Sequence, residues 1–468
     1  MGASWSSADP GGNSRPGGAG NAAAIPSIGS SGDSSKRQRR IAGEHQWQLI
    51  PGLPDEVAMH ALARVPRSRH PAMKLVCSSW RQVMSSSEIF RLRRELGVVE
   101  EWLYVLMKDK EEELVWFALD PLTAQWRRLP PMPDVDHHQH HRQQQQERDL
   151  AGWSLWELGS SISGMVRSLF GKKDSSERIP FFGCSAAELH GCLFVLGGFS
   201  KASATSSVWK YDPRTNSWSK AAAMGTARAY CKTGLVDGNL YAVGGVNRGR
   251  NGLTPLQSAE VYDPEADAWS AIPSMPFVGA QVLPTAFVTD ILKPIATGMA
   301  AFRGKLWVPQ SLYSWPFFVD VGGEVFDPVS GRWEEMPRGM GEGWPARQAG
   351  MKLSVVVNGS LFSLDPMSTA EGSKIKVYDF EQDCWRVVVR KVPMVLDLST
   401  ESESPYLLGC LRSGLHVVTK DAGNNVTILR AEIDGGRGAG DSEAESWTVI
   451  ASKSFGRVEL VACQVLEI

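Results

Sequence analysis

The sequence predicts a small helical domain followed by a six-bladed β-propeller that the C-terminal strand closes. One observation for the propeller is an internal repeat of about 50 residues with several short apolar runs in each copy. A second is that an aspartate precedes a tryptophan by six positions in five copies of this repeat. A third predicts the helical domain, because apolar residues recur at helical spacing between residues 44 and 97.

The clearest copy of the repeat runs from Asp237 to Trp269. Asp237-Gly238 suits a two-residue hairpin turn, because both residue types tolerate positive φ angles. The run from Leu240 to Val243 reads as a strand, and Gly244-Gly245 lets two backbones approach closely. The five pairs are Asp120 and Trp126, Asp212 and Trp218, Asp263 and Trp269, Asp327 and Trp333, and Asp379 and Trp385. A sixth, degraded copy ends at Trp447.

The repeat resembles the kelch motif, in which a double glycine is followed by a tyrosine and a tryptophan. The matching residues are Gly197-Gly198 with Tyr211 and Trp218, and Gly244-Gly245 with Tyr262 and Trp269. The fourth and fifth copies carry Pro309-Gln310 and Asp365-Pro366 in place of the glycines, so those blades are assigned from the Asp–Trp spacing. The resemblance implies a kelch-type propeller over residues 98–468.

The first 43 residues are rich in Gly, Ser, Ala and Pro. Such a segment carries too little apolar surface to fold, so we expect a disordered tail over residues 1–43. The basic cluster from Lys36 to Arg40 ends this tail and fits either a nuclear import signal or a solvated charge run.

The predicted helical domain spans residues 44–97. Pro54 suits the first position of a helix, and Asp55 and Glu56 favour the positive end of its dipole. We expect a second helix from about Pro71 that places Met73, Val76, Cys77, Trp80 and Val83 on one face, and a third from about Glu88 to Leu96. Three short helices cannot bury all their apolar faces alone, so the pattern indicates a partner.

This domain resembles an F-box. The similarity rests on Leu53-Pro54-Asp55-Glu56-Val57, on Val65-Pro66, and on the run from Val76 to Arg81. The resemblance implies docking on a Skp-type adaptor through Leu53, Pro54, Val57, Leu62, Val65, Val76 and Trp80. The alternative is that Val76, Cys77 and Trp80 form an internal core. An F-box followed by kelch repeats is typical of plant F-box/kelch-repeat proteins.

The first blade lacks its innermost strand. Only three runs precede the second repeat, at Trp102–Met107, Leu114–Leu119 and Gln125–Arg128. An unpaired run from Val458 to Leu466 remains after Trp447. Because closure removes the sheet edges, we expect this C-terminal run to complete the first blade.

An insertion over residues 134–179 separates the first two blades. It opens with a tract of histidine and glutamine, which reads as low-complexity linker more readily than as a metal site. Trp153 to Phe170 fits an amphipathic helix, packed across the propeller or gripping a partner.

Long connections gather on one face of the predicted propeller, where the second and third strands of each blade are joined. Loops on a rigid scaffold carry recognition, so we expect the target site there. Its candidate anchors are aromatic and arginine residues: Phe199, Arg228, Arg248, Arg250, Tyr313, Trp315, Phe317, Trp344 and Arg347. Each could instead be an ordinary loop or blade residue.

Composition excludes several classes of function. The net charge is −2, which gives no general case for binding nucleic acid or membranes. Seven dispersed cysteines without a C-x-x-C pair indicate reduced thiols, and with the absence of an apolar signal core they favour an intracellular protein of the nucleus or cytoplasm. We find no phosphate-binding loop, metalloprotease motif or nucleophile elbow, and expect no cofactor or catalytic residue.

The two resemblances together imply the substrate-recognition subunit of a Skp–cullin–F-box ubiquitin ligase. Its F-box would bind the adaptor, and through it the cullin, while the propeller binds a target protein. Two alternatives remain, a kelch-propeller enzyme of the oxidase or lyase type and a kelch scaffold that engages no ligase.

Overall fold

The computed structural model describes residues 48–111, 113–133, 181–200, 203–249, 252–277, 294–314, 317–344, 352–365, 373–389, 391–393, 406–421, 423, 425–432 and 447–468. The part of the chain from Gln48 to Ile468 forms one compact unit. The predicted tail, its basic cluster and the insertion over residues 134–179 lie outside the described residues.

The helical domain contains short helices in the order α1, η1, α2, α3 and α4. Their bounds are α1 Asp55–Ala63, the 3₁₀ turn η1 Arg67–Arg69, α2 His70–Met73, α3 Ser78–Val83 and α4 Ser87–Glu95. The prediction of one helix from Pro71 to Val83 was wrong, because Cys77 is extended with φ −159° and begins a new helix. Its Sγ accepts the backbone N–H of Trp80, and Val76, directly before this break, is exposed to solvent.

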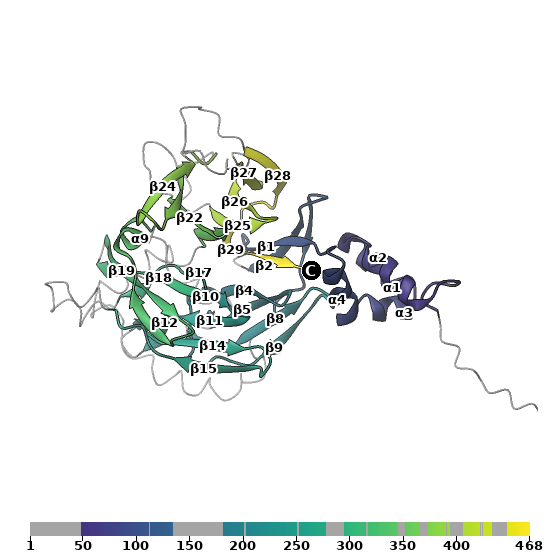
Figure 1. The fold of residues 1–468 in the computed structure, drawn as a ribbon, viewed down its shortest axis with the longest axis horizontal. Helices are drawn as coiled ribbons and strands as arrows, with labels where there is room; N and C mark the ends of the chain where they lie inside the picture. Colours follow the sequence, from purple (N-terminus) through teal and green to yellow (C-terminus); the bar gives the residue numbers. More distant parts are fainter. Residues whose placement is uncertain are drawn as a thin grey trace, which may run out of the picture. The chain divides into compact units, whose positions relative to one another are not determined.

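In the described residues six antiparallel sheets of four or five strands follow, and Figure 1 shows them arranged around a common centre as the blades of a propeller. Blade 1 contains β29 Glu459–Glu467, β1 Glu101–Lys108, β2 Leu114–Asp120 and β3 Gln125–Arg128; blade 2 contains β4 Ser185–Leu189, β5 Cys192–Leu196, β8 Val208–Asp212 and β9 Ser217–Ala221; blade 3 contains β10 Lys232–Val236, β11 Asn239–Val243, β14 Ala259–Asp263 and β15 Ala268–Ile272. Blade 4 contains β16 Ile295–Ala296, β17 Ala300–Phe302, β18 Lys305–Ser314, β19 Phe317–Asp327 and β20 Arg332–Glu335; blade 5 contains β21 Ser354–Val357, β22 Ser360–Asp365, β23 Lys374–Asp379 and β24 Cys384–Val389; blade 6 contains β25 Leu407–Leu411, β26 Gly414–Lys420, β27 Asn425–Ala431 and β28 Trp447–Ser454.

The C-terminal strand closes the ring, as predicted. β29 pairs antiparallel with β1 over its whole length, with Trp102 opposite Leu466 and Val105 opposite Cys463. Two backbone hydrogen bonds of 2.9 Å between Glu100 and Ile468 extend the pairing. The first and last segments of the propeller therefore share one blade.

The aspartate of each Asp–Trp pair forms the turn between the third and fourth strands. Its Oδ1 accepts the backbone N–H two residues further on, at 2.8 to 3.0 Å. The bonds join Asp120 to Leu122, Asp212 to Arg214, Asp263 to Glu265, Asp327 to Val329, and Asp379 to Glu381. These are turns in which aspartate replaces a backbone acceptor, which explains why the residue recurs.

The tryptophan of each pair ties its blade to the blade before it. The indole N–H donates to a backbone carbonyl at the exit of the preceding blade: Trp218 to Pro130, Trp269 to Ala222, Trp333 to Pro273 and Trp385 to Met340, at 2.7 to 3.0 Å. At the seam Trp126 has no acceptor and instead meets Phe455 edge-on, with ring centroids 5.1 Å apart. The spacing of the repeat thus encodes contacts between blades.

Replacing Trp269 by Phe should lower the free energy of unfolding by about 1 kcal/mol more than replacing Trp126 by Phe. Only the first change removes a hydrogen-bond donor from a backbone carbonyl, that of Ala222. Both variants lose the same ring volume, so Trp126→Phe is the matched control. Urea denaturation measures the difference. Equal losses would show that the indole hydrogen bond adds nothing to packing.

The helical domain packs against blades 1 and 2. Leu62, Met73 and Phe90 share one buried cluster with Trp102 and Tyr104 of β1. The sequence predicted that these helices need a partner for their apolar faces, and part of that partner is the chain's own propeller.

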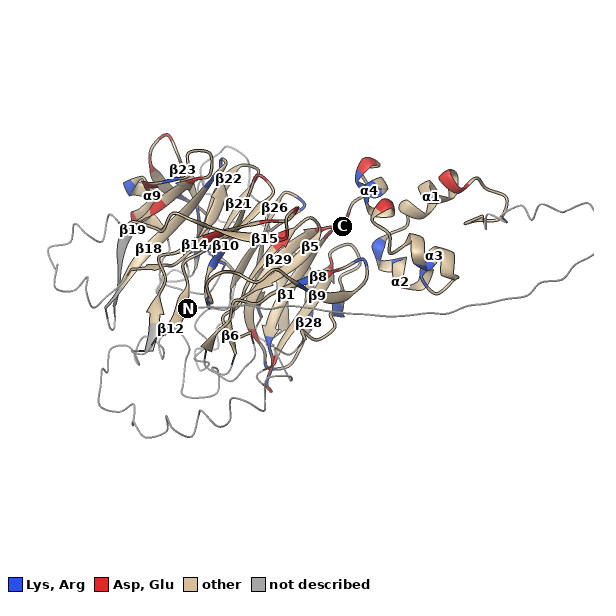
Figure 2. Ribbon diagram, turned by 90° about the horizontal axis from the view of Figure 1, so that it is seen from below, with Lys and Arg blue, Asp and Glu red and all other residues tan. Residues whose placement is uncertain are grey.

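These contacts fall on the ends of the sheets that carry the turns between third and fourth strands. The Lys74 ammonium donates to the carbonyl of Arg214 in such a turn of blade 2, and Arg127 donates to the carbonyl of Ser68 at 2.7 Å. Figure 2 shows the hairpin strands β6 Phe199–Ser200 and β12 Val246–Gly249, which belong to connections between second and third strands, projecting from one side of the sheets. The helical domain and these hairpins thus occupy different sides of the propeller.

Candidate functional site

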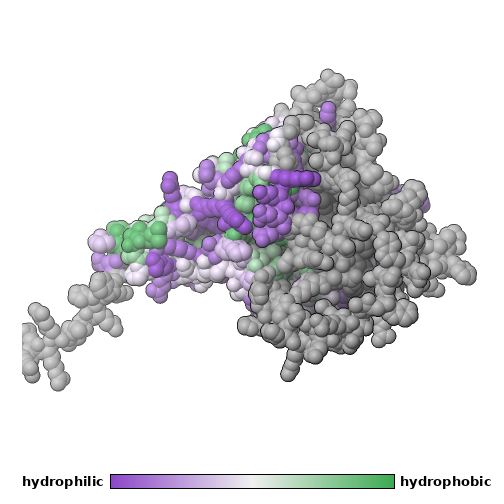
Figure 3. Space-filling model, turned by 180° about the vertical axis from the view of Figure 1, so that it is seen from behind, coloured by the Kyte–Doolittle hydropathy of each residue, from purple (hydrophilic) through white to green (hydrophobic). Residues whose placement is uncertain are grey.

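One part of the helical domain exposes large apolar side chains. Leu75 is 78% exposed, Val76 62%, Val57 50% and Leu53 36%, and Pro54 beside them is also exposed. We call Leu53, Pro54, Val57, Leu75 and Val76 the apolar patch. Figure 3 shows hydrophobic surface gathered on the helical domain. Soluble proteins seldom leave such residues grouped at the surface unless something binds there.

A hydrogen bond brings the two halves of the apolar patch together. The Trp80 indole donates to the carbonyl of Leu49 at 2.7 Å, which holds the segment before α1 against α3. Leu53 and Pro54 follow that segment, and Val76 precedes α3. The half-buried Trp80 therefore links the segment that precedes Leu53 to the helix that follows Val76.

The sequence candidates for adaptor binding separate into two groups. Leu53, Pro54, Val57 and Val76 lie in the apolar patch. Leu62 is buried, and Val65 and Trp80 are partly buried against the same cluster, shared with the propeller. Leu75 was missed, because one continuous helix gives it no place on the apolar face.

Three of the nine candidates for target binding are not surface residues. Phe199, Arg228 and Trp344 are buried, which corrects the prediction that they are exposed anchors. Trp344 packs edge-on against Trp385, with ring centroids 5.7 Å apart. The remaining candidates are Arg248, Tyr313 and Phe317, of which only the strand backbone is described, and Arg250, Trp315 and Arg347, which lie outside the described residues.

Arg228 is enclosed between strands of blade 3. Its Nη2 lies 2.6 Å from Oε1 of Glu260, and its Nη1 donates to the carbonyls of Gly244 and Ser258 at 3.0 and 2.7 Å. Burial alone would raise the pKa of Glu260, but the hydrogen bonds and charge of Arg228 hold it below its usual value. The pair is a structural element of the propeller.

Two small hairpins form part of the loop-rich face, namely β6 Phe199–Ser200 with β7 Ser203–Ala204, and β12 Val246–Gly249 with β13 Gly252–Pro255. Phe199 of the first hairpin and Val246 of the second share a buried cluster with Ala229, and Phe182 and Tyr230 pack against it. Apolar packing therefore gives the loops of blades 2 and 3 a fixed base.

Neither a candidate metal centre nor a membrane-spanning helix is found among the described residues. These residues hold no group of three or more His, Cys, Asp or Glu side chains that could bind a metal ion. None of their helices has the length and apolar character to cross a membrane.

Comparison with known protein families identifies the helical domain and two blades of the propeller. The F-box domain model matches residues 50–92, and the Kelch motif model matches residues 180–225 and 227–276. An F-box/kelch-repeat protein of Arabidopsis thaliana is 51% identical over 458 residues, which cover 93% of this chain and 95% of the relative. This chain belongs to the F-box/kelch-repeat proteins.

Two further F-box/kelch-repeat proteins of Arabidopsis thaliana are each 29% identical. One match covers 70% of this chain and 67% of the relative, the other 78% of each. The kelch matches fall on blades 2 and 3, in which a double glycine directly follows the second strand. The predicted resemblance to plant F-box/kelch-repeat proteins is confirmed.

His70 lies where the F-box meets the kelch propeller. Its ring is buried, contacts the carbonyl of Val65 at 3.2 Å and meets Phe90 edge-on. Burial first, and then the positive charges of Arg93, Arg67 and Lys74, lower the pKa of His70 to about 3. The folded protein therefore keeps this imidazole neutral.

The pKa of His70 in the folded protein lies below its unfolded value of 6.5, so the unfolded chain takes up a proton first as the pH falls. The free energy of unfolding is therefore highest above pH 6.5 and decreases as the pH drops toward 3. Between pH 7 and pH 5 we expect wild type to lose about 2 kcal/mol more stability than His70→Gln. Urea denaturation at both pH values tests this, with the exposed His60→Gln as control. Equal pH dependence in wild type and His70→Gln would contradict it.

Proposed function

We propose that this F-box/kelch-repeat protein is the substrate-recognition subunit of a Skp–cullin–F-box ubiquitin ligase. The apolar patch carries the proposal. One side of the F-box is buried against blades 1 and 2, while Leu53, Val57, Leu75 and Val76 remain exposed and need a partner. A Skp-type adaptor is the partner that an F-box implies, and the adaptor in turn would recruit the cullin.

The receptor itself would perform no bond chemistry. Its propeller would hold a target protein through the loop-rich face, whose hairpins rest on the cluster around Phe199 and Val246. The F-box would hold the adaptor through a different side of the molecule. Simultaneous binding raises the effective concentration of target lysines near the ubiquitin-charged enzyme. The protein would act in the nucleus or the cytoplasm and would need no cofactor.

A kelch-propeller enzyme is the alternative that the sequence left open. A metal-dependent reaction would need converging polar ligands, and the described residues offer no such group. No observation favours this alternative or a scaffold without a ligase.

Calorimetric titration of the purified full chain with a Skp-type adaptor tests the proposal. Val57→Asp/Val76→Asp should weaken binding by at least about 100-fold, because two carboxylates would be desolvated in an apolar contact. Leu53→Ala/Pro54→Ala should weaken it as well. The control is Val329→Asp, at a 91% exposed position of blade 4, which should leave the affinity unchanged. A folded wild-type chain that binds no adaptor would refute the proposal.

A further inference from the structure

The segment joining the F-box to the propeller is short and fixed. Helix α4 ends at Glu95 and β1 begins at Glu101. Within that segment the backbone N–H of Gly97 donates to the carbonyl of Arg94, and that of Val98 to the carbonyl of Arg93. Glu100 then joins the blade through its two backbone bonds to Ile468.

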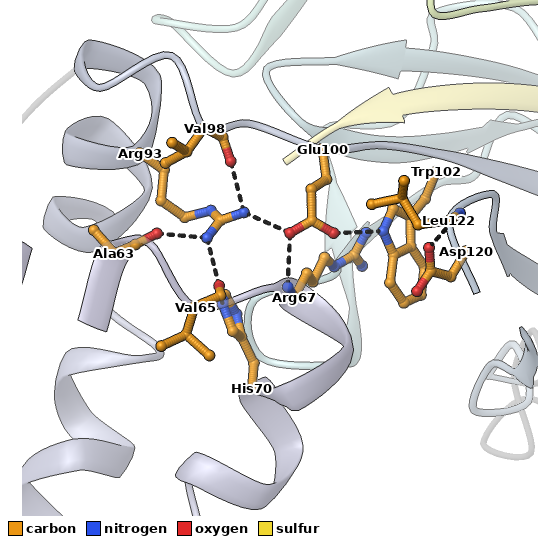
Figure 4. Close-up of polar contacts among 10 residues, drawn as sticks. All are labelled: Ala63, Val65, Arg67, His70, Arg93, Val98, Glu100, Trp102, Asp120 and Leu122. Carbon is orange, nitrogen blue, oxygen red and sulfur yellow. Dashed lines mark hydrogen bonds and ion pairs between the residues drawn. The ribbon is translucent and has the colours of Figure 1, made fainter. Parts of the chain in front are cut away.

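Arg93 of α4 lies fully buried beside this segment. Its Nη1 donates to the carbonyls of Ala63 and Val65 at 2.6 and 2.8 Å, and its Nη2 donates to the carbonyl of Val98 at 2.9 Å. The same Nη2 lies 2.9 Å from Oε1 of Glu100 (Figure 4). One guanidinium therefore connects α1, the residues after it and the linker.

The Glu100 carboxylate collects donors from both domains. Its Oε1 accepts from Arg93 and from the backbone N–H of Arg67 at 2.8 Å. Its Oε2 accepts the indole N–H of Trp102 on β1 at 3.2 Å (Figure 4). Helix α4, the turn η1 and strand β1 thus meet at one side chain.

A second layer of contacts runs parallel to the first. The Arg67 guanidinium donates to the hydroxyl of Tyr104 at 2.6 Å and lies 4.3 Å from the centre of the Trp102 ring. Arg127 of β3 faces the same ring at 5.2 Å and also donates to Ser68. Contacts from three directions hold the F-box against blades 1 and 2.

We propose that Glu100 is a positioning residue, which with Arg93 locks the F-box on the propeller and so fixes the direction in which adaptor and cullin project from the target-binding face. The lock itself follows from contacts within the chain. Its consequence for ubiquitin transfer rests on the proposed function. A buried ion pair that loses one partner leaves a buried charge without compensation, which makes Glu100 sensitive to substitution.

Pulsed electron paramagnetic resonance on the full chain tests the lock, with labels introduced as unnatural amino acids at the exposed positions 60 and 329. We expect one narrow distance distribution in wild type and a distribution at least twice as wide in Glu100→Ala. The control is Glu342→Ala, which removes a carboxylate from an exposed ion pair with Arg338. If Glu100→Ala does not fold, Glu100→Gln, which keeps the side-chain size, is measured in its place. A variant with the wild-type width would overturn the proposal.

Adaptor titration of the same variants separates this inference from the proposed function. Glu100→Ala should bind the adaptor within about twofold of wild type, since the apolar patch does not include Glu100. Failure of wild type to bind would defeat the ligase assignment and leave the lock intact. In the reconstituted ligase, mass spectrometry should find ubiquitin on more receptor lysines in Glu100→Ala than in wild type. An unchanged set of modified lysines would overturn the positioning role.

Discussion

A chain lacking residues 458–468 should lose cooperative unfolding of the whole propeller. The deletion removes β29, which pairs with β1 along its length and buries Leu460, Cys463 and Leu466. Each buried leucine alone contributes about 2–5 kcal/mol, while a complete domain is stable by only about 5–15 kcal/mol. Blade 1 would also expose the edge of β1, so we expect aggregation.

Thermal unfolding followed by circular dichroism measures this effect, and a point variant refines it. Leu466→Asp places a charge at a fully buried position of β29 and should be nearly as damaging as the deletion. Val449→Asp, at an exposed position of the neighbouring β28, is the matched control and should unfold close to wild type. A truncated chain with an unfolding midpoint within a few degrees of wild type would show that the seam does not hold the ring.

Replacing Arg228 by Ala should lower the free energy of unfolding by about 3–5 kcal/mol, because Glu260 would remain buried without its counter-charge. Two backbone carbonyls would also lose their donor. The double variant Arg228→Met/Glu260→Met removes both charges and should be less damaging than the single change.

Urea denaturation compares these variants with Arg338→Ala, which removes an arginine from an exposed ion pair and should change stability by about 0.5 kcal/mol or less. The result also decides how Arg228 acts. A loss of about 3–5 kcal/mol in the free energy of unfolding supports a structural role for Arg228. A stable Arg228→Ala chain would contradict the buried ion pair.

The propeller could be predicted from the sequence because its repeat records local and neighbouring contacts. Each aspartate closes a turn two residues ahead, and four of the five tryptophans reach the preceding blade. Both contacts recur at fixed spacing. The closing strand could be predicted because the first blade lacked its innermost strand, while the apolar run from Val458 to Leu466 belonged to no blade.

The site residues were harder to predict, because exposure depends on partners far away in the chain. Arg228 stands near a loop but pairs with Glu260, 32 residues later. Val76 and Leu75 became the most exposed part of the apolar patch only because Cys77 interrupts the expected helix. Helical periodicity gives no sign of that break.

The lock around Glu100 had no sequence signal at all. Arg93 donates mainly to backbone carbonyls, which any residue could supply. Glu100 receives its donors from three separate elements. A pattern of residue types cannot report contacts of this kind.

We propose that this chain carries a target-binding propeller into a Skp–cullin ligase. The most direct measurement is size-exclusion chromatography with light scattering of the full chain mixed with a Skp-type adaptor and the adaptor-binding part of a cullin. We expect one complex containing one copy of each protein, and no such complex with Val57→Asp/Val76→Asp. A folded wild-type chain that elutes apart from the adaptor–cullin pair would contradict the account.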